Sequence, residues 1–189
     1  MKKTERRISR GRLAGALSLL ASLPLFPAPC PAGEGGLEAG VKAAYIYNFT
    51  QFVEWEAPSS TAAAAGKFTV CVLGGGPMAS SLAALDGRKA GAAEIKVLRL
   101  KENGPFSDCR ILFIPGSLGG SLPALLRGLG RGVLTVSDMP GFAGKGGIIG
   151  FFTEEKRVRI EVNPRRAGEA GLKLSPRLLQ VSRIIGDPR

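Results

Sequence analysis

The stretch that decides the fold is GVLTVSDMPGFAGKGGIIGFFTEEKRVRIEVN, residues 132–163, in which three strand-like runs surround a glycine-rich loop. Residues 133–136 and 147–152 are apolar on both faces, and runs of this kind belong inside a sheet. Residues 158–162 alternate apolar and charged side chains, which is typical of a strand at the rim of a sheet. The polar residues 153–157 are of hairpin length, so the second and third runs should pair antiparallel. We therefore expect a mixed sheet.

Strand-like and helix-like segments alternate before this stretch. Strands are expected at residues 67–73, 94–98 and 109–114, and helices at residues 37–55, 78–85 and 121–129. Gly130-Arg131-Gly132 should end the last of these helices. An alternation of this kind predicts a largely parallel sheet with helices on its faces.

Two short helices are expected after the hairpin. Asn163-Pro164 is a helix start signal, so residues 165–170 should form the first. The second follows Ser175-Pro176 and should close the core with five apolar residues. These are Leu178, Leu179, Val181, Ile184 and Ile185. The predicted fold class is α/β: a single compact domain with a mostly parallel mixed sheet, an antiparallel edge hairpin, and helices on both faces.

Residues 1–32 have the pattern of a cleaved signal peptide. A basic start precedes the apolar run 13–26, which is too short to span a bilayer comfortably and is ended by prolines. Cleavage is predicted after Ala32, which leaves a domain of residues 33–189 without stable membrane insertion. Export by the general secretory route is favoured.

Two alternatives to this interpretation of the leader stay open. Arg6-Arg7 is compatible with the twin-arginine route, although the surrounding residues fit that signal poorly. The second alternative is that Cys30 becomes the first residue of the mature chain and carries a lipid anchor. Pro29 directly before it is a poor context for the processing of such a lipoprotein.

The net charge limits the classes of partner that the chain is expected to bind. Residues 1–32 carry six Lys or Arg and one Glu, so the net charge is +11 for the whole chain and +6 for the remainder. The tightest basic cluster comprises Arg165, Arg166, Lys173, Arg177 and Arg183. Nucleic-acid binding needs aromatic residues interleaved with such charges, and this cluster has none, so we expect no nucleic-acid partner. A solvated basic face or attraction to an anionic membrane surface is favoured.

Two cysteines remain after the leader. Cys71 and Cys109 each lie in an apolar run, and an exported chain reaches an oxidising compartment, so we expect a disulfide between them. A redox-active pair and two buried free thiols are the other interpretations. The chain has no Cys-x-x-Cys spacing that would favour redox chemistry.

The chain lacks the residues for common catalysis. It contains no histidine, which excludes Ser-His-Asp triads, Cys-His pairs and histidine zinc sites. Asp138 follows a predicted strand and is the best candidate for acid/base work, but an Asp that caps its own turn is favoured. Glu154, Glu155 and Glu161 are interpreted as solvated hairpin charges. We expect no enzyme activity, no cofactor and no metal.

Six residues are candidates for partner or ligand binding. Asp138 is one of them. In the first predicted helix, Tyr45, Phe49 and Phe52 recur at helical spacing and are interpreted as core anchors. Tyr47 and Trp55 do not follow this spacing, so they are candidates for a partner-facing surface. Phe142 is compatible with two positions, packed over the sheet or exposed as a contact for a partner. Lys173 and Arg177 suit an acidic partner, a small carboxylate ligand or a wet helix face.

Five blocks of sequence span nearly all of the predicted domain. They are KAAYIYNF at residues 42–49, CRILFI at 109–114, LTVSD at 134–138 with GFA at 141–143, GIIGF at 147–151, and GLKLS at 171–175 with RLL at 177–179. In their sequence and their order, these blocks resemble the YfiR family of periplasmic proteins. The best known member has a second, more C-terminal disulfide, whereas this chain has no cysteine after Cys109. Redox-sensitive control is therefore left open here.

The resemblance implies a regulator that can dimerise. It would bind the periplasmic region of an inner-membrane diguanylate cyclase and repress it, lowering cyclic di-GMP signalling and biofilm formation. The alternative function is a periplasmic small-molecule receptor without catalytic activity. Its ligand is expected outside the carboxyl ends of the parallel strands, near residues 74–77 and 137–141.

Overall fold

The computed structural model describes residues 34–56 and 66–186. The chain divides into two units, Met1–Pro31 and Ala32–Arg189, and all described residues belong to the second. The predicted signal peptide and its cleavage bond lie outside the described residues.

One eight-stranded sheet organises the domain, with the strand order β10-β8-β7-β6-β5-β2-β4-β3. Its strands are β2 (Lys67–Leu73), β3 (Lys89–Ala90), β4 (Ala93–Leu100), β5 (Ile111–Ile114), β6 (Leu134–Ser137), β7 (Ile149–Glu154), β8 (Arg157–Val162) and β10 (Arg183–Ile184). The five strands from β4 to β7 in this order are parallel. The predicted hairpin is confirmed, because β7 and β8 pair antiparallel from Ile149↔Val162 to Glu154↔Arg157. The α/β fold class predicted from the sequence is confirmed.

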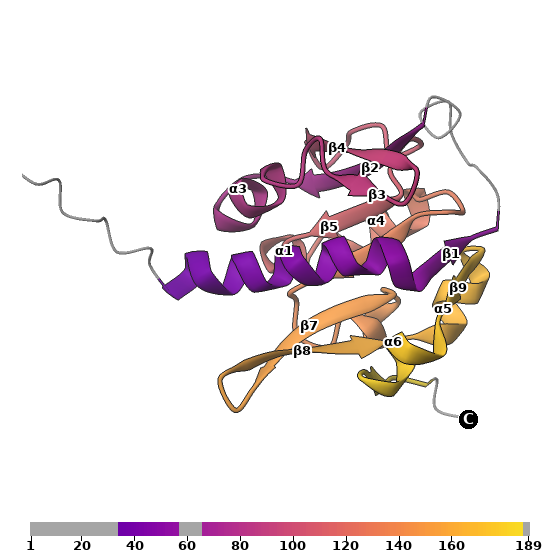
Figure 1. The fold of residues 1–189 in the computed structure, drawn as a ribbon. Coiled ribbons are helices and arrows are strands. Elements are labelled where there is room, and N and C mark those ends of the chain that lie inside the picture. Colours follow the sequence, from indigo (N-terminus) through magenta and orange to yellow (C-terminus); the bar gives the residue numbers. More distant parts are fainter. Residues whose placement is uncertain (1–33, 57–65, 187–189) are drawn as a thin grey trace, which may run out of the picture. The chain divides into compact units, whose positions relative to one another are not determined.

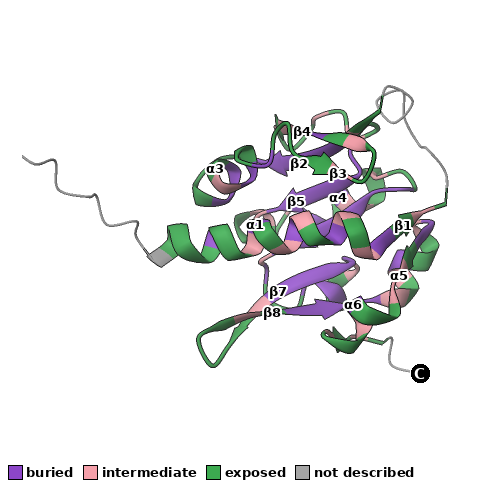
Figure 2. Ribbon diagram, in the orientation of Figure 1, coloured by how far each residue is buried: buried purple, intermediate pink, exposed green. Residues whose placement is uncertain are grey.

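Helices cover both faces of this sheet (Figure 1). They are α1 (Glu34–Phe52), α3 (Pro77–Ala83), α4 (Leu122–Gly128), α5 (Pro164–Glu169) and α6 (Pro176–Gln180), with short 3-10 turns η1 (Gly116–Leu118) and η2 (Ala143–Lys145). In β2, Val70 and Val72 belong to the core under α1 and α3, whereas Cys71 and Leu73 belong to the core under α4. This alternation follows from the two-residue period of a strand. Figure 2 shows the central strands buried between these layers.

The predicted disulfide is present in the structure. Cys71 and Cys109 are bonded, with their Cα atoms 5.7 Å apart, and both residues are buried. The bond joins β2 to the chain just before β5, which are neighbours in the sheet. It closes a loop of 38 residues.

Two helix predictions are corrected. Helix α1 ends at Phe52, and the last three residues predicted as helical form β1 (Val53–Trp55). They pair antiparallel with β9 (Leu172–Leu174), and these ladder hydrogen bonds replace helical ones. Helix α6 ends at Gln180, and β10 follows at Arg183–Ile184, parallel to β8.

The prediction that five apolar residues at the C-terminal end close the core is wrong for two of them. Leu178 is buried, but Val181 is 68% exposed and Ile184 is 48% exposed. Within the described residues, no helix is long and apolar enough to cross a membrane.

Candidate functional site

Asp138 lies at the carboxyl end of β6 and connects three segments. Its Oδ1 accepts a hydrogen bond from the Gly116 N–H at 2.8 Å, and its Oδ2 lies 3.4 Å from the Lys42 Nζ. Lys42 also lies 2.7 Å from Glu38, and only 12% of its side chain is exposed. The expectation that Asp138 caps its own turn is wrong, because the Ser137 Oγ accepts from the Met139 N–H at 3.0 Å. Asp138 instead holds α1 and the loop after β5 at this end of the sheet.

Tyr47 and Trp55 make contacts within the domain. The Tyr47 hydroxyl donates to the Lys89 carbonyl at 3.0 Å, and the Arg88 guanidinium lies 4.3 Å from its ring centroid. The Trp55 Nε1–H donates to the Gly132 carbonyl at 2.9 Å, and its ring packs edge-on against Phe68. Both residues are half-buried.

Phe142 and Glu161 lie in the interior. Phe142 has no exposed surface and packs in the core under α4. Glu161 was expected to be solvated, but it is only 6% exposed, and its Oε1 accepts from the Ala143 N–H at 3.1 Å. Asn163 donates to the Ala143 carbonyl at 3.0 Å. These two side chains hold η2, which explains why a charged residue is tolerated in β8.

Lys173 and Arg177 are exposed. Lys173 lies in β9, opposite Glu54 in β1, and its Nζ is 3.8 Å from the Glu56 Oε1. Arg177 lies in α6 and forms no ion pair or hydrogen bond with another residue of the described chain. The structure brings Trp55 and Lys173 together on the β1–β9 pair, at the opposite end of the sheet from Asp138.

A groove lies at the carboxyl ends of β2, β4 and β5, where the alternative function placed a ligand. The order of the parallel strands reverses between β2 and β5, which is where open α/β sheets commonly bind ligands. The groove includes Gly74 and Gly75 but not residues 137–141. The Arg99 side chain lies over Gly75, and its Nε donates to the Gly74 carbonyl at 2.5 Å, so an arginine already covers this glycine loop.

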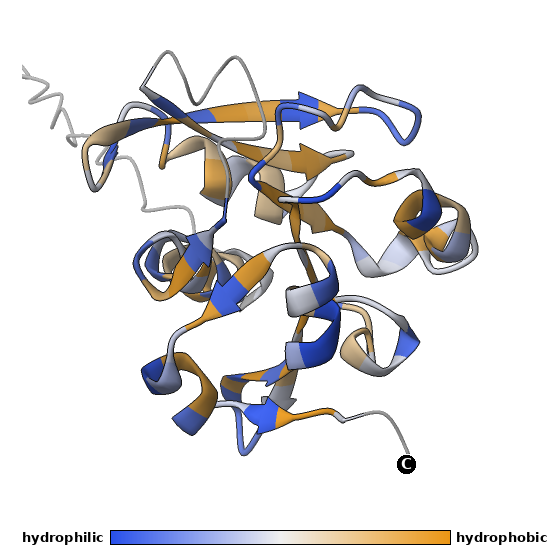
Figure 3. Cartoon of the chain, turned by 90° about the vertical axis from the view of Figure 1, so that its right-hand side faces the viewer, coloured by the Kyte–Doolittle hydropathy of each residue, from blue (hydrophilic) through white to orange (hydrophobic). Residues whose placement is uncertain are grey.

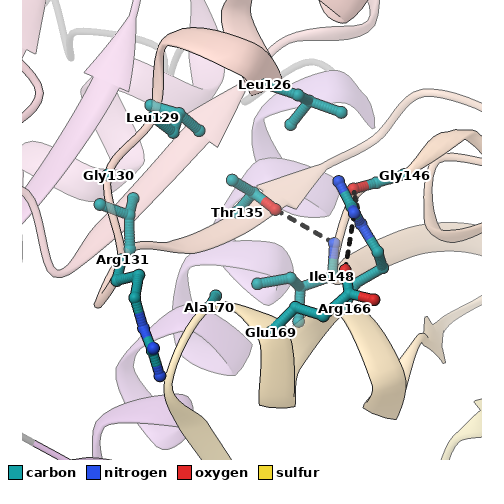
Figure 4. Close-up of a pocket in the computed structure, with 11 residues that line it drawn as sticks. Leu126, Leu129, Gly130, Arg131, Thr135, Gly146, Ile148, Arg166, Glu169 and Ala170 are labelled. Carbon is teal, nitrogen blue, oxygen red and sulfur yellow. Dashed lines mark hydrogen bonds and ion pairs between the residues drawn. The ribbon is translucent and has the colours of Figure 1, made fainter.

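A second depression lies at the amino ends of β6 and β7, and we call it the Arg131–Arg166 crevice (Figure 4). Its volume is about 180 Å³. Five apolar side chains line its floor and sides: Leu126, Leu129, Val133, Ile148 and Ala170. They come from α4 and the chain after it, the segments entering β6 and β7, and the end of α5. The Thr135 Oγ1 accepts from the Ile148 N–H at 3.1 Å and fixes the two strand segments beside each other.

Two guanidinium groups flank the crevice on opposite sides (Figure 4). The Arg166 Nε donates to the Gly146 carbonyl at 3.1 Å, and its Nη1 lies 2.7 Å from the Glu169 Oε2. The Arg131 Nη2 lies 3.7 Å from the Glu56 Oε2, and the Arg131 side chain is 73% exposed. Arg131 also passes over Gly171, where a Cβ atom would stand 3.1 Å from its Nη2. Glycine at this position allows the close approach.

Two carboxylates around this end of the domain are each shared between two cations. Glu56 lies near Arg131 and Lys173, and Glu169 lies near Arg165 and Arg166. Each group of three therefore keeps an excess positive charge. Figure 3 faces the side where β1, β9 and α5 lie in Figure 1, and hydrophilic segments alternate there with apolar ones.

Neither Arg131 nor Glu169 was predicted from the sequence as a site residue, and Arg166 was predicted only as one member of a wider basic cluster. From the sequence, Arg131 was interpreted as one of the dispersed basic residues and as part of a helix-ending Gly-Arg-Gly turn. Arg131 and Arg166 are far apart in the chain, and they line the same crevice because the chain that enters β6 lies beside the end of α5, where the Gly132 N–H donates to the Ala170 carbonyl at 2.7 Å. No local pattern carries that information.

Among the residues that the structure describes, no three His, Cys, Asp or Glu side chains are grouped so that they could hold a metal ion.

Comparison with known proteins then gives the family. The family model described as YfiR/HmsC-like matches residues 39–183, which runs from α1 through β10. No curated protein matches the chain significantly. Because the family model covers most of the chain, the protein belongs to the YfiR/HmsC-like family.

Proposed function

We propose that this protein is an exported regulator that binds the periplasmic region of an inner-membrane diguanylate cyclase and holds the enzyme inactive. Cyclic di-GMP signalling and biofilm formation would then rise when the repression is relieved. The observation that carries this proposal is the YfiR/HmsC-like match over residues 39–183.

Features of the domain support a binding role in an oxidising compartment. The buried Cys71–Cys109 disulfide is of the kind that persists outside the reducing cytosol. Asp138, the best candidate for acid/base chemistry, is engaged by Gly116 and Lys42. A regulator needs a contact surface rather than reactive groups.

The N-terminal half of α1 is the surface that we assign to the cyclase. Leu37 is 67% exposed and Val41 is 46% exposed, and Ala44 follows three residues later on the same helix face. We call these three residues the α1 stripe. Clusters of large apolar side chains that are exposed to solvent commonly mark interaction sites. Figure 2 shows this half of α1 as mostly exposed.

Contacts at the carboxyl end of the sheet would keep the stripe in place. Lys42 lies between Glu38 and Asp138, so the helix is tied to the loops after β5 and β6 next to the stripe. A preordered helix loses less conformational entropy on binding than a flexible one.

Repression requires unequal affinity for two forms of the cyclase. To turn an enzyme population from 99% active to 99% inactive, the regulator must bind the inactive form about 10⁴-fold more tightly. A regulator with equal affinity for both forms would bind without effect.

The test is capture of membrane proteins by the chain purified from the periplasm. Detergent-solubilised inner membrane is passed over the wild-type protein, a Leu37→Asp/Val41→Asp variant, and a Val181→Asp/Ile184→Asp control that changes equally exposed apolar residues elsewhere. We expect mass spectrometry to identify a diguanylate cyclase with the wild type and the control but not with the α1 variant. Absence of any cyclase from all three samples contradicts the proposed function. Equal capture by both variants contradicts only the assigned surface.

A further inference from the structure

One edge of the sheet is only partly covered by its last strand. The strand order ends with β4 and β3, so β3 is the outer strand at this edge (Figure 1). β3 has two residues, and it pairs with β4 only at Lys89↔Glu94 and Ala90↔Ala93. Most of the eight residues of β4 therefore lie beyond β3.

The chain before β3 covers β4 for a short distance further. The Gly87 N–H donates to the Ile95 carbonyl at 2.9 Å, and the Ile95 N–H donates to the Arg88 carbonyl at 2.8 Å. The Val97 N–H donates to the Asp86 Oδ1 at 2.7 Å. The cover ends with this hydrogen bond.

The backbone of β4 after this point faces outward at alternate residues. The Leu100 carbonyl accepts from the Gly74 N–H at 3.1 Å, so Leu100 directs its backbone groups toward β2, and its neighbour Arg99 directs them away. Within the described residues, the Val97 carbonyl and the N–H and carbonyl of Arg99 have no hydrogen-bond partner. We call residues Val97–Leu100 the open β4 edge. A row of unpaired backbone groups of this kind can pair with another strand.

The side chains of the open β4 edge differ between the two faces of the sheet. Leu98 and Leu100 are half-buried against the core under α4, whereas the Arg99 side chain is exposed on the other face. Leu100 also lines the groove at the carboxyl ends of β2, β4 and β5, together with Pro115 and Leu118. An added strand would therefore meet apolar surface with every second side chain and Arg99 with the others.

The charges along this edge decide which strand fits. Lys96, Arg99 and Lys101 are exposed, and the carboxylates beside them are Asp86 and Glu102. Asp86 is already engaged by the Val97 N–H and lies 3.4 Å from the Lys96 Nζ. A second copy of β4 would bring like charges against one another, which is destabilising, whereas acidic side chains would be attracted.

We propose that the open β4 edge binds an extended acidic segment of a partner protein, which adds a strand to the sheet. The segment's backbone bonds to the Val97 carbonyl and to the N–H and carbonyl of Arg99. Its acidic side chains lie on the face of Arg99, and its apolar side chains lie on the face of Leu98 and Leu100. Main-chain hydrogen bonds then supply affinity, and the alternate side chains supply specificity.

This surface goes beyond the regulator function and does not depend on it. The open β4 edge shares no residue with the α1 stripe, which lies in the N-terminal half of α1. Binding at the edge can therefore be measured without a cyclase present, and its failure would leave the proposed function untouched.

The experiment uses synthetic peptides and amide NMR spectra of the labelled protein purified from the periplasm. The first probe is a blocked octapeptide of alternating glutamate and valine. The second has lysine in place of glutamate, and the third is the acidic peptide with its two central backbone N–H groups methylated. The readouts are the shifts of the amide signals and the hydrogen-exchange rate of the Arg99 N–H.

We expect the acidic peptide to shift the amide signals of Val97 to Leu100 and, at saturation, to slow exchange of the Arg99 N–H about tenfold or more. The lysine and methylated peptides should have much weaker effects. Equal binding of the acidic and lysine peptides contradicts the charge argument. No protection of the Arg99 N–H by any peptide overturns the proposal, as do shifts confined to other parts of the domain.

Three variants separate the backbone from the charge. Arg99→Pro removes an N–H that faces solvent, a position at which an edge strand tolerates proline. Arg99→Gln keeps the N–H and removes the charge, and Arg127→Gln is a control at an exposed arginine on α4.

The three variants should rank in affinity for the acidic peptide. We expect a loss of more than about tenfold in Arg99→Pro, about two- to fivefold in Arg99→Gln, and none in Arg127→Gln. The amide spectrum of free Arg99→Pro checks that the variant is folded. Equal affinity of Arg99→Pro and Arg99→Gln would show that the backbone at Arg99 is not used and would overturn the proposal.

Discussion

At the scale of single residues, buried polar side chains set the conformation of the loop between β6 and β7. Glu161 and Asn163 bind the N–H and carbonyl of Ala143, and Thr135 binds the N–H of Ile148. All three side chains are at least 94% buried, so water cannot replace these hydrogen bonds. The loop carries Gly146, which Arg166 contacts, so the same residues also position one side of the crevice.

Replacing Glu161 tests this arrangement. Glu161→Ala leaves the Ala143 N–H without its acceptor, and we expect the free energy of unfolding to fall by about 1–3 kcal/mol. Glu155→Ala, at an exposed position in the same hairpin, should change it by less than about 0.5 kcal/mol. Urea denaturation of both variants measures the difference, and equal stabilities would contradict the structural role of Glu161.

Asp86 should make stability depend on acidic pH. The Val97 N–H donates to its Oδ1 at 2.7 Å, and this hydrogen bond lowers the pKa of the carboxyl group below its ordinary 3.8, with Lys96 helping. A depressed pKa in the folded state adds stability above pH 3.8, and this contribution is lost as the pH falls through the folded-state pKa.

An Asp86→Asn variant isolates this effect, because the amide keeps an acceptor for Val97 but does not titrate. We expect the stability of the wild type relative to Asp86→Asn to be constant near neutral pH and to decrease as the solution is acidified below about pH 4. Urea midpoints across this range provide the measurement. A constant difference down to about pH 2 would show that the Asp86 pKa is not depressed.

At the scale of helices and strands, the long apolar elements were predictable and the short ones were not. Strand β2 and the β7–β8 hairpin have runs whose periodicity is visible in the sequence alone. By contrast, β1 is three residues long and pairs with β9, more than a hundred residues away. The local pattern of Val53–Trp55 continues that of α1, so only this distant pairing ends the helix.

The candidate sites also differ in whether the local sequence or a distant contact determines them. The Cys71–Cys109 pair was predictable because the sequence offers one pairing after the leader. The Arg131–Arg166 crevice was not, because it depends on how β6 and β7 align and on where α5 packs. Tyr47 in α1 and Trp55 in β1 both bind carbonyl groups inside the domain, and a helical pattern in the sequence cannot distinguish such contacts from an exposed surface.

The turn of the β7–β8 hairpin stores strain that a substitution can relieve. Glu155 and Lys156 have φ angles of +49° and +60°, a left-handed conformation that Asn and Gly adopt more readily. We expect Glu155→Asn/Lys156→Gly to stabilise the protein by about 1–2 kcal/mol. Glu155→Gln removes the charge but keeps the strain, so it should have little effect. Thermal unfolding of the two variants distinguishes strain from charge. Equal melting temperatures of the two variants would contradict the claim that the turn is strained.

At the scale of the whole molecule, the disulfide joins the two halves of the parallel sheet. It links β2 to the chain before β5, across the point where the strand order reverses. Closing a loop of 38 residues restricts the unfolded chain.

Removal of this bond should destabilise the domain without changing its fold. We expect Cys71→Ser/Cys109→Ser to lower the free energy of unfolding by about 3–4 kcal/mol on the loop-entropy model. Urea denaturation of the oxidised wild type and of the variant measures the loss. A variant as stable as the wild type would show that packing alone holds β2 and β5 together.

The most direct test of the regulator account is the cyclic di-GMP content of cells that lack this protein. The deletion strain is complemented with the wild type, with Leu37→Asp/Val41→Asp, or with the Val181→Asp/Ile184→Asp control, and each protein's periplasmic level is checked. The account predicts that cyclic di-GMP rises on deletion and returns to its original level with the wild type and the control, but not with the α1 variant. Cyclic di-GMP that is unchanged by the deletion would contradict it.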